Sequence, residues 1–595
     1  MCGINGILRL EERAAPIDHA ELRRVRDHMA QRGPDAVGEW IAPDGVIGLG
    51  HRRLAIIDLS PDGHQPMSWA DGRYWIVFNG EIYNYRELRV ELERAGVTFR
   101  SHSDTEVILA LYAREGVAML SRLRGMFAVA LWDTVERRLL LARDPYGIKP
   151  LYYAVQEGTL RFASQVKALE AGGTLPMEID PAGVVGFLLW GSVPEPLTLR
   201  RAIRALPASH YMLVEQGRVN EPHAYYQFSA ARPDGTGSLV ETLRDTVRAH
   251  LVADVPVAIF LSAGLDSTLI AALARREVVE PPVTFTLRFE RFVGTPYDEA
   301  PLAAEVARRL GTRHVERTID RQAMPDLWAR VMAAMDQPSI DGFNTYVVSQ
   351  VAHEAGLKVV LSGLGGDELF GGYPSFHDVP HWVQQARRLG RIPGLSRVWP
   401  RVATRLRPGQ PKLRGLLRYG DALPGAYYLR RGLFLPEELP ALIGVEITRA
   451  GLAAYDPIHD TVPGVNEVAD DGWQSVHLLE STRYMRQQLL RDSDWASMAH
   501  SLELRVPLVD VRLRDQAARL NFEPARSAGK AAVVQQAAPE LPPAVWTRPK
   551  SGFFIPVLDW LDDRDDKRTD LHWGRDSRKL ALRVLKEWDQ TLVKG

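Results

Sequence analysis

The sequence contains a single cysteine in 595 residues, and that cysteine is residue 2. One cysteine excludes an internal disulfide framework, which fits a reducing compartment. A basic start followed by a long apolar run is also missing, so we expect no signal peptide. The longest apolar runs, such as VPVAIFL at 255–261, are far shorter than a membrane span requires. We therefore expect a cytoplasmic protein without a membrane partner.

The sequence also lacks an excess of charge of either sign. Lys and Arg number 73 and Asp and Glu number 74, which gives a formal net charge of −1. Such a balance provides no global field that would attract nucleic acid, so we expect none as a partner. Apolar residues make up 46% of the chain, as in ordinary globular proteins. The length predicts about two to four domains.

The pattern of apolar residues divides the chain into two halves. Up to about residue 215, short β-like runs such as YWIVFNG, MFAVALWD and RLLLARD predict a sheet-rich domain. Beyond about residue 240, strand-like runs alternate with helical ones, which predicts a parallel sheet covered on both faces. The intervening FSAARPDGTGSL is rich in Gly, Ser, Pro and Asp. We expect domains at 2–215 and 240–595, joined by a linker at 216–239.

Cys2 would become the first residue after removal of Met1, and would then carry a thiol and a free α-amine on one carbon. An α-amine has an ordinary pKa of about 7.7–8.0, so it can take the proton of the thiol without help from a histidine. Arg53 and Asp104 are candidates to bind an α-carboxylate and an α-ammonium group. The side-chain amide of Asn79 and the backbone N–H of Gly80 could stabilise a tetrahedral oxyanion.

Taken one at a time, these residues favour no function. A lone cysteine is more often incidental, and Arg53 or Asp104 alone would be a surface charge. Asn79 and Gly80 alone would indicate a hairpin turn.

Taken in order along the chain, however, the first-half motifs resemble a known domain. MCGI, RGPD (32–35), HRRLAIID (51–58), FNGEIYNY (78–85), SDTE (103–106), GMFAVALWD (125–133) and ARDPYGIKPLYY (142–153) resemble the glutamine amidotransferase domain of the N-terminal-nucleophile class. The resemblance implies a four-layer αββα domain that hydrolyses glutamine, with Cys2 as nucleophile and Asn79 and Gly80 as oxyanion hole. The glutamine-binding residues that it implies are Arg53, Ile57, Asn79, Gly80, Glu81 and Asp104.

In the second half, SAGLDST (262–268) lies between a predicted strand and a predicted helix. Small residues there let backbone N–H groups face an anion, and Asp266 could hold Mg²⁺. Alone, the heptapeptide would be read equally well as an ordinary Gly-Ser turn. It resembles the pyrophosphate loop of ATP pyrophosphatases, except that Ala263 replaces a glycine. If that position needs a positive φ, alanine costs about 1–2 kcal/mol.

Four further motifs extend the resemblance over nearly the whole chain. LSGLGGDELFGGYPSF (361–376), SMAHSLELRVPLVD (497–510), SAGK (527–530) and RPKSGFFIPVLDWL (548–561) are similar, in order, to the glutamine-hydrolysing asparagine synthetase family. The resemblance implies a parallel-sheet α/β ATP-pyrophosphatase domain, of the adenine nucleotide α-hydrolase type, that uses ATP and Mg²⁺, with Lys530 as its catalytic lysine. The implied ATP-binding residues are Leu261, Ser262, Gly264, Asp266, Ser267, Leu287, Ser362 and Gly363. The implied acceptor or adenylate residues are Leu364, Asp367 and Tyr373, and the implied metal ligands are Asp266 and Asp367.

The reaction that this resemblance implies joins two sites. Glutamine is hydrolysed at Cys2, ATP adenylates the carboxylate of aspartate with release of pyrophosphate, and ammonia attacks the adenylate to give asparagine and AMP. The expected partners are therefore small molecules, and a homodimer is left open. Amination of a sugar or phosphoribosyl group would need a different second half, and SAGLDS and LSGLGGDE argue against it.

Two residues depart from the pattern of the best-known asparagine synthetases. Leu364 replaces a glutamate, and Trp495 replaces an arginine or lysine found in many relatives. Leucine has no charge and no proton affinity, so the acceptor could be a carboxylate other than aspartate. We prefer aspartate because the other family residues are present, and a degenerate or regulatory protein is the third alternative.

Overall fold

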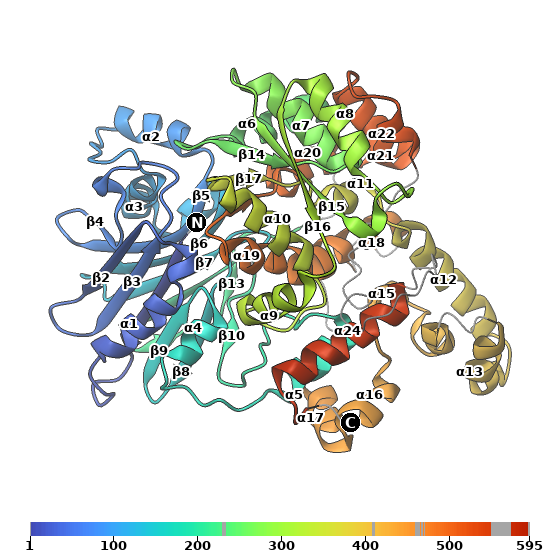
Figure 1. The fold of residues 1–595 in the computed structure, drawn as a ribbon. Coiled ribbons are helices and arrows are strands. Elements are labelled where there is room, and N and C mark those ends of the chain that lie inside the picture. The colour runs from blue at the N-terminus through green and yellow to red at the C-terminus, as the bar shows by residue number, and fades with distance from the viewer. Residues whose placement is uncertain are drawn as a thin grey trace.

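The structure is a computed structural model, and it describes residues 2–228, 234–406, 411–458, 465, 468, 471–548 and 573–592. Residues 549–561 of the RPKSGFFIPVLDWL motif and residues 229–233 of the expected linker lie outside the described residues. In Figure 1 the first half, in blue and teal, and the second half, in green to red, lie side by side. The N-terminus lies at the junction between them.

The first half contains two antiparallel sheets. The first has the strand order β10-β8-β9-β1-β3-β2, and the second has the order β12-β11-β7-β6-β5-β4, with β13 beside β11. The first sheet consists of β1 (Gly3–Arg9), β2 (Ala36–Ile41), β3 (Ile47–Arg53), β8 (Tyr152–Gln156), β9 (Thr159–Ala163) and β10 (Arg204–Ala205). The second consists of β4 (Met67–Trp69), β5 (Tyr74–Ile82), β6 (Gly125–Asp133), β7 (Arg138–Arg143), β11 (His210–Glu215), β12 (Arg218–Val219) and β13 (His223–Ala224).

Both faces of β5, β6 and β7 in the second sheet are buried, which explains their nearly continuous apolar runs. Successive side chains of a strand point to opposite faces. In β6, Phe127 and Val129 therefore belong to one apolar cluster, and Ala128 and Trp132 belong to another that also contains residues of the first sheet, such as Leu49. The second cluster is the core between the two stacked sheets.

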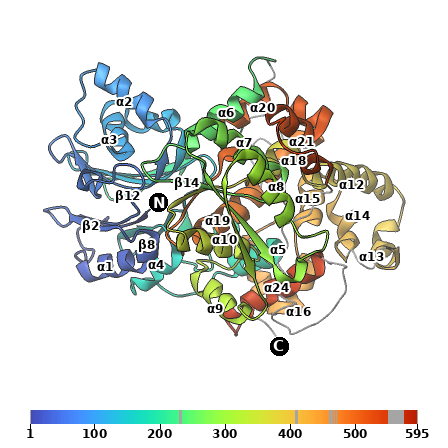
Figure 2. The same cartoon turned by 45° about the horizontal axis from the view of Figure 1, so that its top comes forward.

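Helices cover the two outer faces of this pair of sheets. The helices α2 (Tyr85–Arg94) and α3 (Asp104–Glu115) pack on the second sheet, and α1 (His19–His28) and α4 (Val166–Ala171) pack on the first. Figure 2 shows α2 and α3 above the sheets and α1 and α4 below them. The four-layer αββα arrangement predicted from the resemblance is confirmed.

The second half is built on a five-stranded sheet in the order β16-β15-β14-β17-β18, in which all neighbours are parallel. Its strands are β14 (Val257–Phe260), β15 (Val283–Phe289), β16 (Arg313–Ile319), β17 (Val359–Leu361) and β18 (Glu503–Arg505). One face is covered by α6 (Leu239–His250), α7 (Leu265–Glu277), α8 (Ala300–Leu310) and α21 (Glu523–Ala537). The other is covered by α10 (Phe343–Glu354), α12 (Ser375–Gly390), α15 (Leu423–Arg431) and α18 (Gly472–Leu479). The predicted doubly covered parallel sheet is confirmed.

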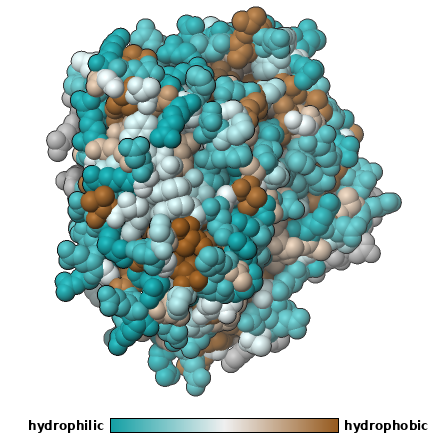
Figure 3. Space-filling view, turned by 90° about the vertical axis from the view of Figure 1, so that its left-hand side faces the viewer, coloured by the Kyte–Doolittle hydropathy of each residue, from teal (hydrophilic) through white to brown (hydrophobic). Residues whose placement is uncertain are grey.

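The other described α-helices are α5 (Pro181–Trp190), α9 (Met324–Ala334), α11 (Gly366–Phe370), α13 (Leu395–Leu406), α14 (Leu416–Tyr419), α16 (Leu439–Ile443), α17 (Val445–Ala454), α19 (Arg491–Met498), α20 (Val511–Arg519), α22 (Ala544–Thr547) and α24 (Trp573–Trp588). A π-helical stretch, Glu480–Leu490, connects α18 to α19. Across the described ranges, every helix is too short or too polar to cross a lipid bilayer. The face of the first half seen in Figure 3 is largely hydrophilic, with scattered apolar patches.

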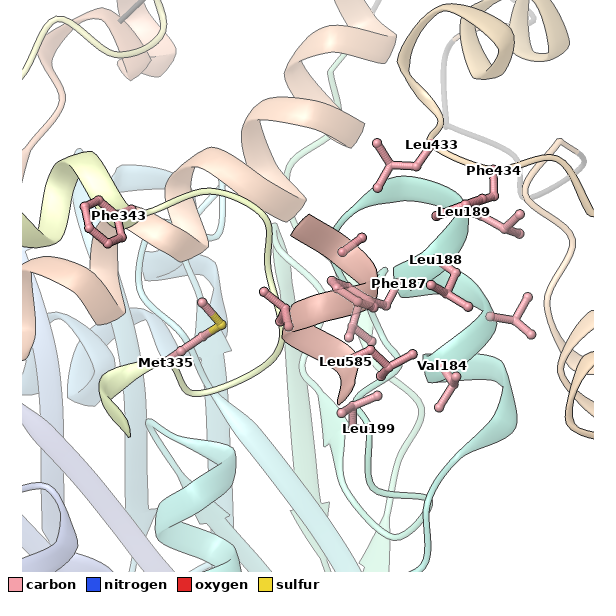
Figure 4. Packing of buried hydrophobic residues seen from close by; sticks show 14 of the residues in the cluster. Val184, Phe187, Leu188, Leu189, Leu199, Met335, Phe343, Leu433, Phe434 and Leu585 are labelled. Carbon is pink, nitrogen blue, oxygen red and sulfur yellow. The ribbon is translucent and has the colours of Figure 1, made fainter. Parts of the chain in front are cut away.

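The helix α5 joins the two halves through a shared core. Its sequence, PAGVVGFLLW, is apolar around the whole helix, which predicts burial on every side. Val184 and Phe187 of α5 belong to one apolar cluster with Leu433 and with Leu585 of α24 (Figure 4). The largest core thus contains a helix from before residue 215 and helices from the second half.

Candidate active sites

Cys2 immediately precedes β1 and lies between the two sheets of the first half. Its side chain is buried, with 7% of its surface exposed. Its backbone N–H donates to Oδ1 of Asn79 on β5 at 2.9 Å. Burial raises the pKa of the Cys2 thiol, and a hydrogen bond from the Leu54 backbone and the nearby Arg53 partly oppose this rise. The predicted nucleophile is therefore held directly beside one predicted oxyanion-hole residue.

Asn79 and Gly80 lie inside β5, because β6 pairs with that strand along its length. The hairpin turn that this dipeptide alone would indicate is absent at 79–80. The Nδ2 atom of Asn79 is buried and has no hydrogen-bond partner among the described residues, so it remains a donor for a substrate oxygen. A Cβ atom at Gly80 would lie 2.0 Å from the carbonyl oxygen of Met126, so only glycine fits there.

Arg53, the last residue of β3, is fixed by carbonyl groups of the loop that follows. Its guanidinium donates to the carbonyl of Ser60 at 2.9 Å and to that of Asp58. Its Nη2 atom lies 3.4 Å from the carbonyl oxygen of Ile57, which places the two predicted glutamine-binding residues together. A Cβ at Gly63 would come within 2.2 Å of Nη2, so this glycine gives the guanidinium its space.

Asp104 is the first residue of α3, and it ties this helix to the end of β5. Its Oδ2 atom accepts a hydrogen bond from the backbone N–H of Ile82 at 2.9 Å. This contact brings Asp104 next to Glu81, the residue that precedes Ile82. Burial raises the pKa of Asp104 to about 6 and also raises that of Glu81. A cation bound beside these carboxyl groups would favour their charged forms.

The two glycine-containing loops of the second half lie at the same edge of the parallel sheet. Residues 262–264 connect β14 to α7, and residues 362–365 connect β17 to α11, with β14 and β17 as neighbouring parallel strands. The hydroxyl oxygens of Ser262 and Ser267 lie 2.8 Å apart, and the N–H of Gly264 donates to the first of them. Ala263 has a negative φ, so the strain considered for an alanine there does not arise.

The two loops touch through glycines, which leave space around two carboxylates. A Cβ at Gly366 would lie 2.0 Å from Oδ1 of Asp266, and one at Gly372 would lie 1.9 Å from Oδ1 of Asp367. A Cβ at Gly363 would lie 2.8 Å from the Cβ of Asp266. Any larger residue at these positions would displace a predicted metal ligand.

Lys530 meets both of these carboxylates. The chain kinks at Gly529, whose φ of 79° favours glycine, and Nζ of Lys530 lies 2.5 Å from Oδ2 of Asp266 and from Oδ1 of Asp367. Burial alone would lower the pKa of Lys530, but the two carboxylates outweigh this effect, and the pKa is raised. The structure thus brings together one predicted catalytic residue and both predicted metal ligands.

Leu261 directly follows β14, and Leu287 lies in the neighbouring strand β15. Both are buried, and the N–H of Leu261 donates to the carbonyl of Phe285 at 2.8 Å. The backbone N–H of Ser362 donates to the carbonyl of Arg505 at 2.8 Å. In the ranges that the structure describes, no three His, Cys, Asp or Glu side chains gather as a metal site made by protein alone.

The predicted acceptor residues lie beside Asp367. Leu364 is partly buried against an apolar cluster that Tyr373 also contacts. The hydroxyl of Tyr373 donates to Oε1 of Glu368 at 3.0 Å, and the guanidinium of Arg431 lies 4.2 Å from the centre of its ring. Burial raises the pKa of Glu368 to about 7.

Trp495 lies in the core of the second half. Its Nε1 donates to Oδ1 of Asp492 at 2.9 Å, and its ring packs against Gly342. Its environment is therefore that of a buried structural residue.

Sequence reasoning missed several charged residues around both sites. Arg32 donates to the carbonyl of Cys2 at 3.1 Å and forms a bidentate ion pair with Asp494 of α19. The sequence did offer a signal for three of these residues, because Arg32 and Glu368 lie within motifs quoted above and Asp494 lies just before one. Arg431 has no such signal, because its place depends on the packing of α15.

Comparison with known proteins covers nearly the whole chain. The family model described as "Glutamine amidotransferase domain" matches residues 1–226, and the one described as "Asparagine synthase" matches residues 238–585. Asparagine synthetase (glutamine-hydrolyzing) 1 of Bacillus subtilis is 32% identical over 94% of this chain and 88% of its own. Asparagine synthetase (glutamine-hydrolyzing) 3 of the same organism is 30% identical over 86% of this chain and 80% of its own. The amidase chry2 of Gibberella zeae is 32% identical over 60% of this chain and 56% of its own.

Proposed function

The chain belongs to the glutamine-hydrolysing asparagine synthetase family and is a glutamine-hydrolysing ligase, and from this premise we propose that it converts aspartate to asparagine with ATP. The proposal depends on one observation: Lys530 forms ion pairs with both Asp266 and Asp367 at the edge of the parallel sheet where loops 262–264 and 362–365 touch. We also propose the division into domains at 2–215 and 240–595, with 216–239 as linker.

In the first half, the proposed step is glutamine hydrolysis at Cys2. After removal of Met1, the nitrogen that now donates to Asn79 is the α-amine, and it accepts the proton of the thiol. The thiolate attacks the carboxamide carbon, and Nδ2 of Asn79 with the N–H of Gly80 stabilises the oxyanion. The protonated α-amine returns this proton to the leaving nitrogen, which departs as ammonia as the C–N bond breaks, and water then hydrolyses the thioester to glutamate and frees the thiol. Arg53 binds the α-carboxylate of glutamine, and Asp104 binds its α-ammonium group. Glu81 adds a further contact to glutamine, and Ile57 lines the pocket.

In the second half, the proposed step is adenylation of the acceptor carboxylate. The hydroxyls of Ser262 and Ser267 and the N–H of Gly264 form hydrogen bonds with one another, and they would exchange these for bonds to phosphate oxygens. The N–H of Gly363 would donate to the same phosphates, with Ser362 beside it. Leu261 and Leu287 would pack against the adenosine. Lys530 donates to the oxygens that gain charge when the bond to pyrophosphate breaks.

The donor set of this site fits Mg²⁺. This ion is usually bound through one or two carboxylates together with phosphate oxygens and water. Asp266 and Asp367 supply two such carboxylates, and Gly366 and Gly372 leave the space beside their oxygens that a Cβ would fill. We propose that these carboxylates hold the ion. When bound, Mg²⁺ would neutralise charge on the departing pyrophosphate.

An acceptor assay tests the proposed function. Purified protein is incubated with ATP, Mg²⁺, aspartate and either glutamine or ammonia, and pyrophosphate, AMP and asparagine are measured. We expect pyrophosphate and asparagine in equal amounts with both nitrogen sources. If aspartate releases no pyrophosphate above the level without acceptor, while glutamine is still hydrolysed, aspartate is the wrong acceptor.

A second candidate is amidation of another carboxylate. It is favoured by the place of Leu364, which packs against the same apolar cluster as Tyr373, at the position where the best-known relatives have a glutamate. A leucine that lines a pocket contributes about 1.5–3 kcal/mol when an apolar group covers it. In the same assay, a panel of carboxylic acids distinguishes this candidate from the first.

Replacement of Leu364 by glutamate separates the two candidates. We expect Leu364→Glu to keep or increase the rate of asparagine formation, because a carboxylate there can take a proton from the incoming amine. General base catalysis typically contributes about 10²–10⁴-fold. The measurement is the rate of asparagine formation with ammonia at saturating ATP.

Leu364→Gln is the matched control, since it has nearly the same shape as glutamate but no proton affinity. If both variants lose the native reaction equally, the acceptor is apolar at this position, because a polar group now lines its pocket without a partner.

A further inference from the structure

Arg505 contacts both candidate sites with different parts of one residue. It ends β18, an edge strand of the parallel sheet, and none of its side chain is exposed. Its carbonyl oxygen accepts a hydrogen bond from the N–H of Ser362, the first residue of the loop 362–365, which we call the second nucleotide loop. Its Nη2 atom lies 3.5 Å from Oε2 of Glu81 in the glutamine site. The motif SMAHSLELRVPLVD, which the proposed chemistry leaves without a role, therefore reaches both sites.

The guanidinium of Arg505 is held rigidly by its other donors. Nε donates to Oε1 of Glu503 at 2.6 Å. Nη1 donates to the carbonyls of His250 and Val252 at 2.8 and 2.6 Å. Because the guanidinium is planar, fixing Nε and Nη1 also fixes the direction in which its third nitrogen points. That nitrogen is Nη2, which faces Glu81.

The contact between Arg505 and Glu81 is an ion pair without a hydrogen bond. Nη2 and Oε2 are both buried, and neither atom has a hydrogen-bond partner in the part of the chain that the structure describes. Their separation of 3.5 Å is longer than a good hydrogen bond but within the range of strong attraction between buried charges. A small displacement of β18 toward β5 would therefore strengthen the contact, and one away from it would weaken the contact.

The second nucleotide loop packs tightly against the residues that follow Arg505. After β18 the chain continues into Leu508 and Val509. A Cβ at Gly365 would lie 2.5 Å from Cγ2 of Val509, and one at Gly366 would lie 2.9 Å from Cδ1 of Leu508. With no free space between them, the loop cannot move without moving residues 505–509.

We propose that Arg505 is a positioning residue shared by the two sites: it holds the carboxylate of Glu81 for glutamine, and it transmits the state of loop 362–365 to that carboxylate. This inference rests on the proposed function of the two sites. Its consequence is that nucleotide bound at the loop changes the affinity for glutamine, and that glutamine changes the affinity for nucleotide by the same factor.

The pH dependence of glutamine hydrolysis provides a readout that general destabilisation would not move. Burial and the neighbouring Glu503 raise the pKa of Glu81, Arg505 lowers it, and Asp104 adds to the rise. Loss of the Arg505 cation therefore raises the pKa of Glu81. In this proposal glutamine binds the carboxylate form of Glu81, so the acidic limb of the glutaminase profile should move to higher pH.

The test compares Arg505→Met and Arg505→Lys with wild type. We measure kcat and KM for glutamine over a pH series, with and without Mg²⁺ and the ATP analogue α,β-methylene-ATP, and pyrophosphate release with ammonia. We expect Arg505→Met to raise the KM for glutamine by about tenfold, within the usual range for coupled sites, and to abolish the effect of the analogue. Pyrophosphate release with ammonia should change far less, because any residue at 505 keeps the carbonyl that binds Ser362.

Arg124→Met is the matched control, since Arg124 is also a buried arginine that joins the halves, through Asp510 and Asp245. It should lower stability without moving the acidic limb. Arg505→Lys keeps a cation beside Glu503. If Arg505→Met does not fold, the KM for glutamine, the pH limb and the response to the analogue of Arg505→Lys test the proposal. The proposal is overturned if both Arg505 variants keep the wild-type KM, pH limb and response to the analogue. A wild-type protein with neither activity would instead overturn the proposed function.

Discussion

Cys2→Ala is expected to abolish glutamine hydrolysis while amide formation from free ammonia continues. The thiol is the proposed nucleophile, and removal of such a group lowers kcat by about 10⁴-fold or more. The substitution removes one sulfur atom and leaves the backbone in place. Residue 2 forms its hydrogen bonds with the side chains of Asn79 and Arg32 through its own backbone N–H and carbonyl, so these bonds persist in the variant. The measurements are glutamate release from glutamine and pyrophosphate release with ammonium chloride.

Cys2→Ser is the control that keeps the shape of the side chain with a weaker nucleophile. A Cys2→Ala protein that still produced glutamate at the wild-type rate would show that another group attacks glutamine. A folded variant that lost the reaction with ammonia would show that the two sites do not work independently.

Asp266→Asn and Asp367→Asn are each expected to abolish pyrophosphate release and to spare glutamine hydrolysis. Asparagine keeps the shape of aspartate, so it fits the space that Gly366 and Gly372 leave around these side chains. The charge is lost, however, and with it a hard ligand for Mg²⁺ and one of the two anions that hold Lys530 in place. We expect a decrease of about 10²–10³-fold or more, as for loss of a single electrostatic contact in a transition state.

The readouts are pyrophosphate release with ammonia and glutamate release with glutamine in the same preparations. Asp378→Asn is a suitable control, because it removes a carboxylate of the second half that pairs with Arg430 on a partly exposed surface. Pyrophosphate release at the wild-type rate in either site variant would exclude that residue from the metal site.

Much of the fold could be predicted from local sequence patterns. The apolar runs of β5 and β6, and the alternation of strands and helices beyond residue 240, fix the kind of sheet without reference to distant residues. The second site was predicted from the resemblance of whole motifs and not from single residues. The structure shows why glycines occur in these motifs: a Cβ at Gly366 or Gly372 would crowd Asp266 or Asp367, and Gly529 has a positive φ.

The contacts between distant segments could not be predicted in this way. Asn79 and Gly80 are typical of a turn, but β6 pairs along the whole of β5 and keeps them in the strand. The same limit applies to Arg505, because nothing near it in the sequence indicates Glu81 as its neighbour. Such partners depend on how the two halves pack, which one sequence does not reveal.

The wholly apolar helix α5 has a consequence for synthesis of the chain on the ribosome. Phe187 packs in one cluster with Leu585, and about 400 residues must be added between them at about 5–20 residues per second, so roughly 20–80 s pass before the partner exists. During this time α5 has no complete apolar surface to cover it, and its apolar side chains stay accessible to solvent. α5 can therefore be fully covered only after α24 has been synthesised, and not when the first half is complete.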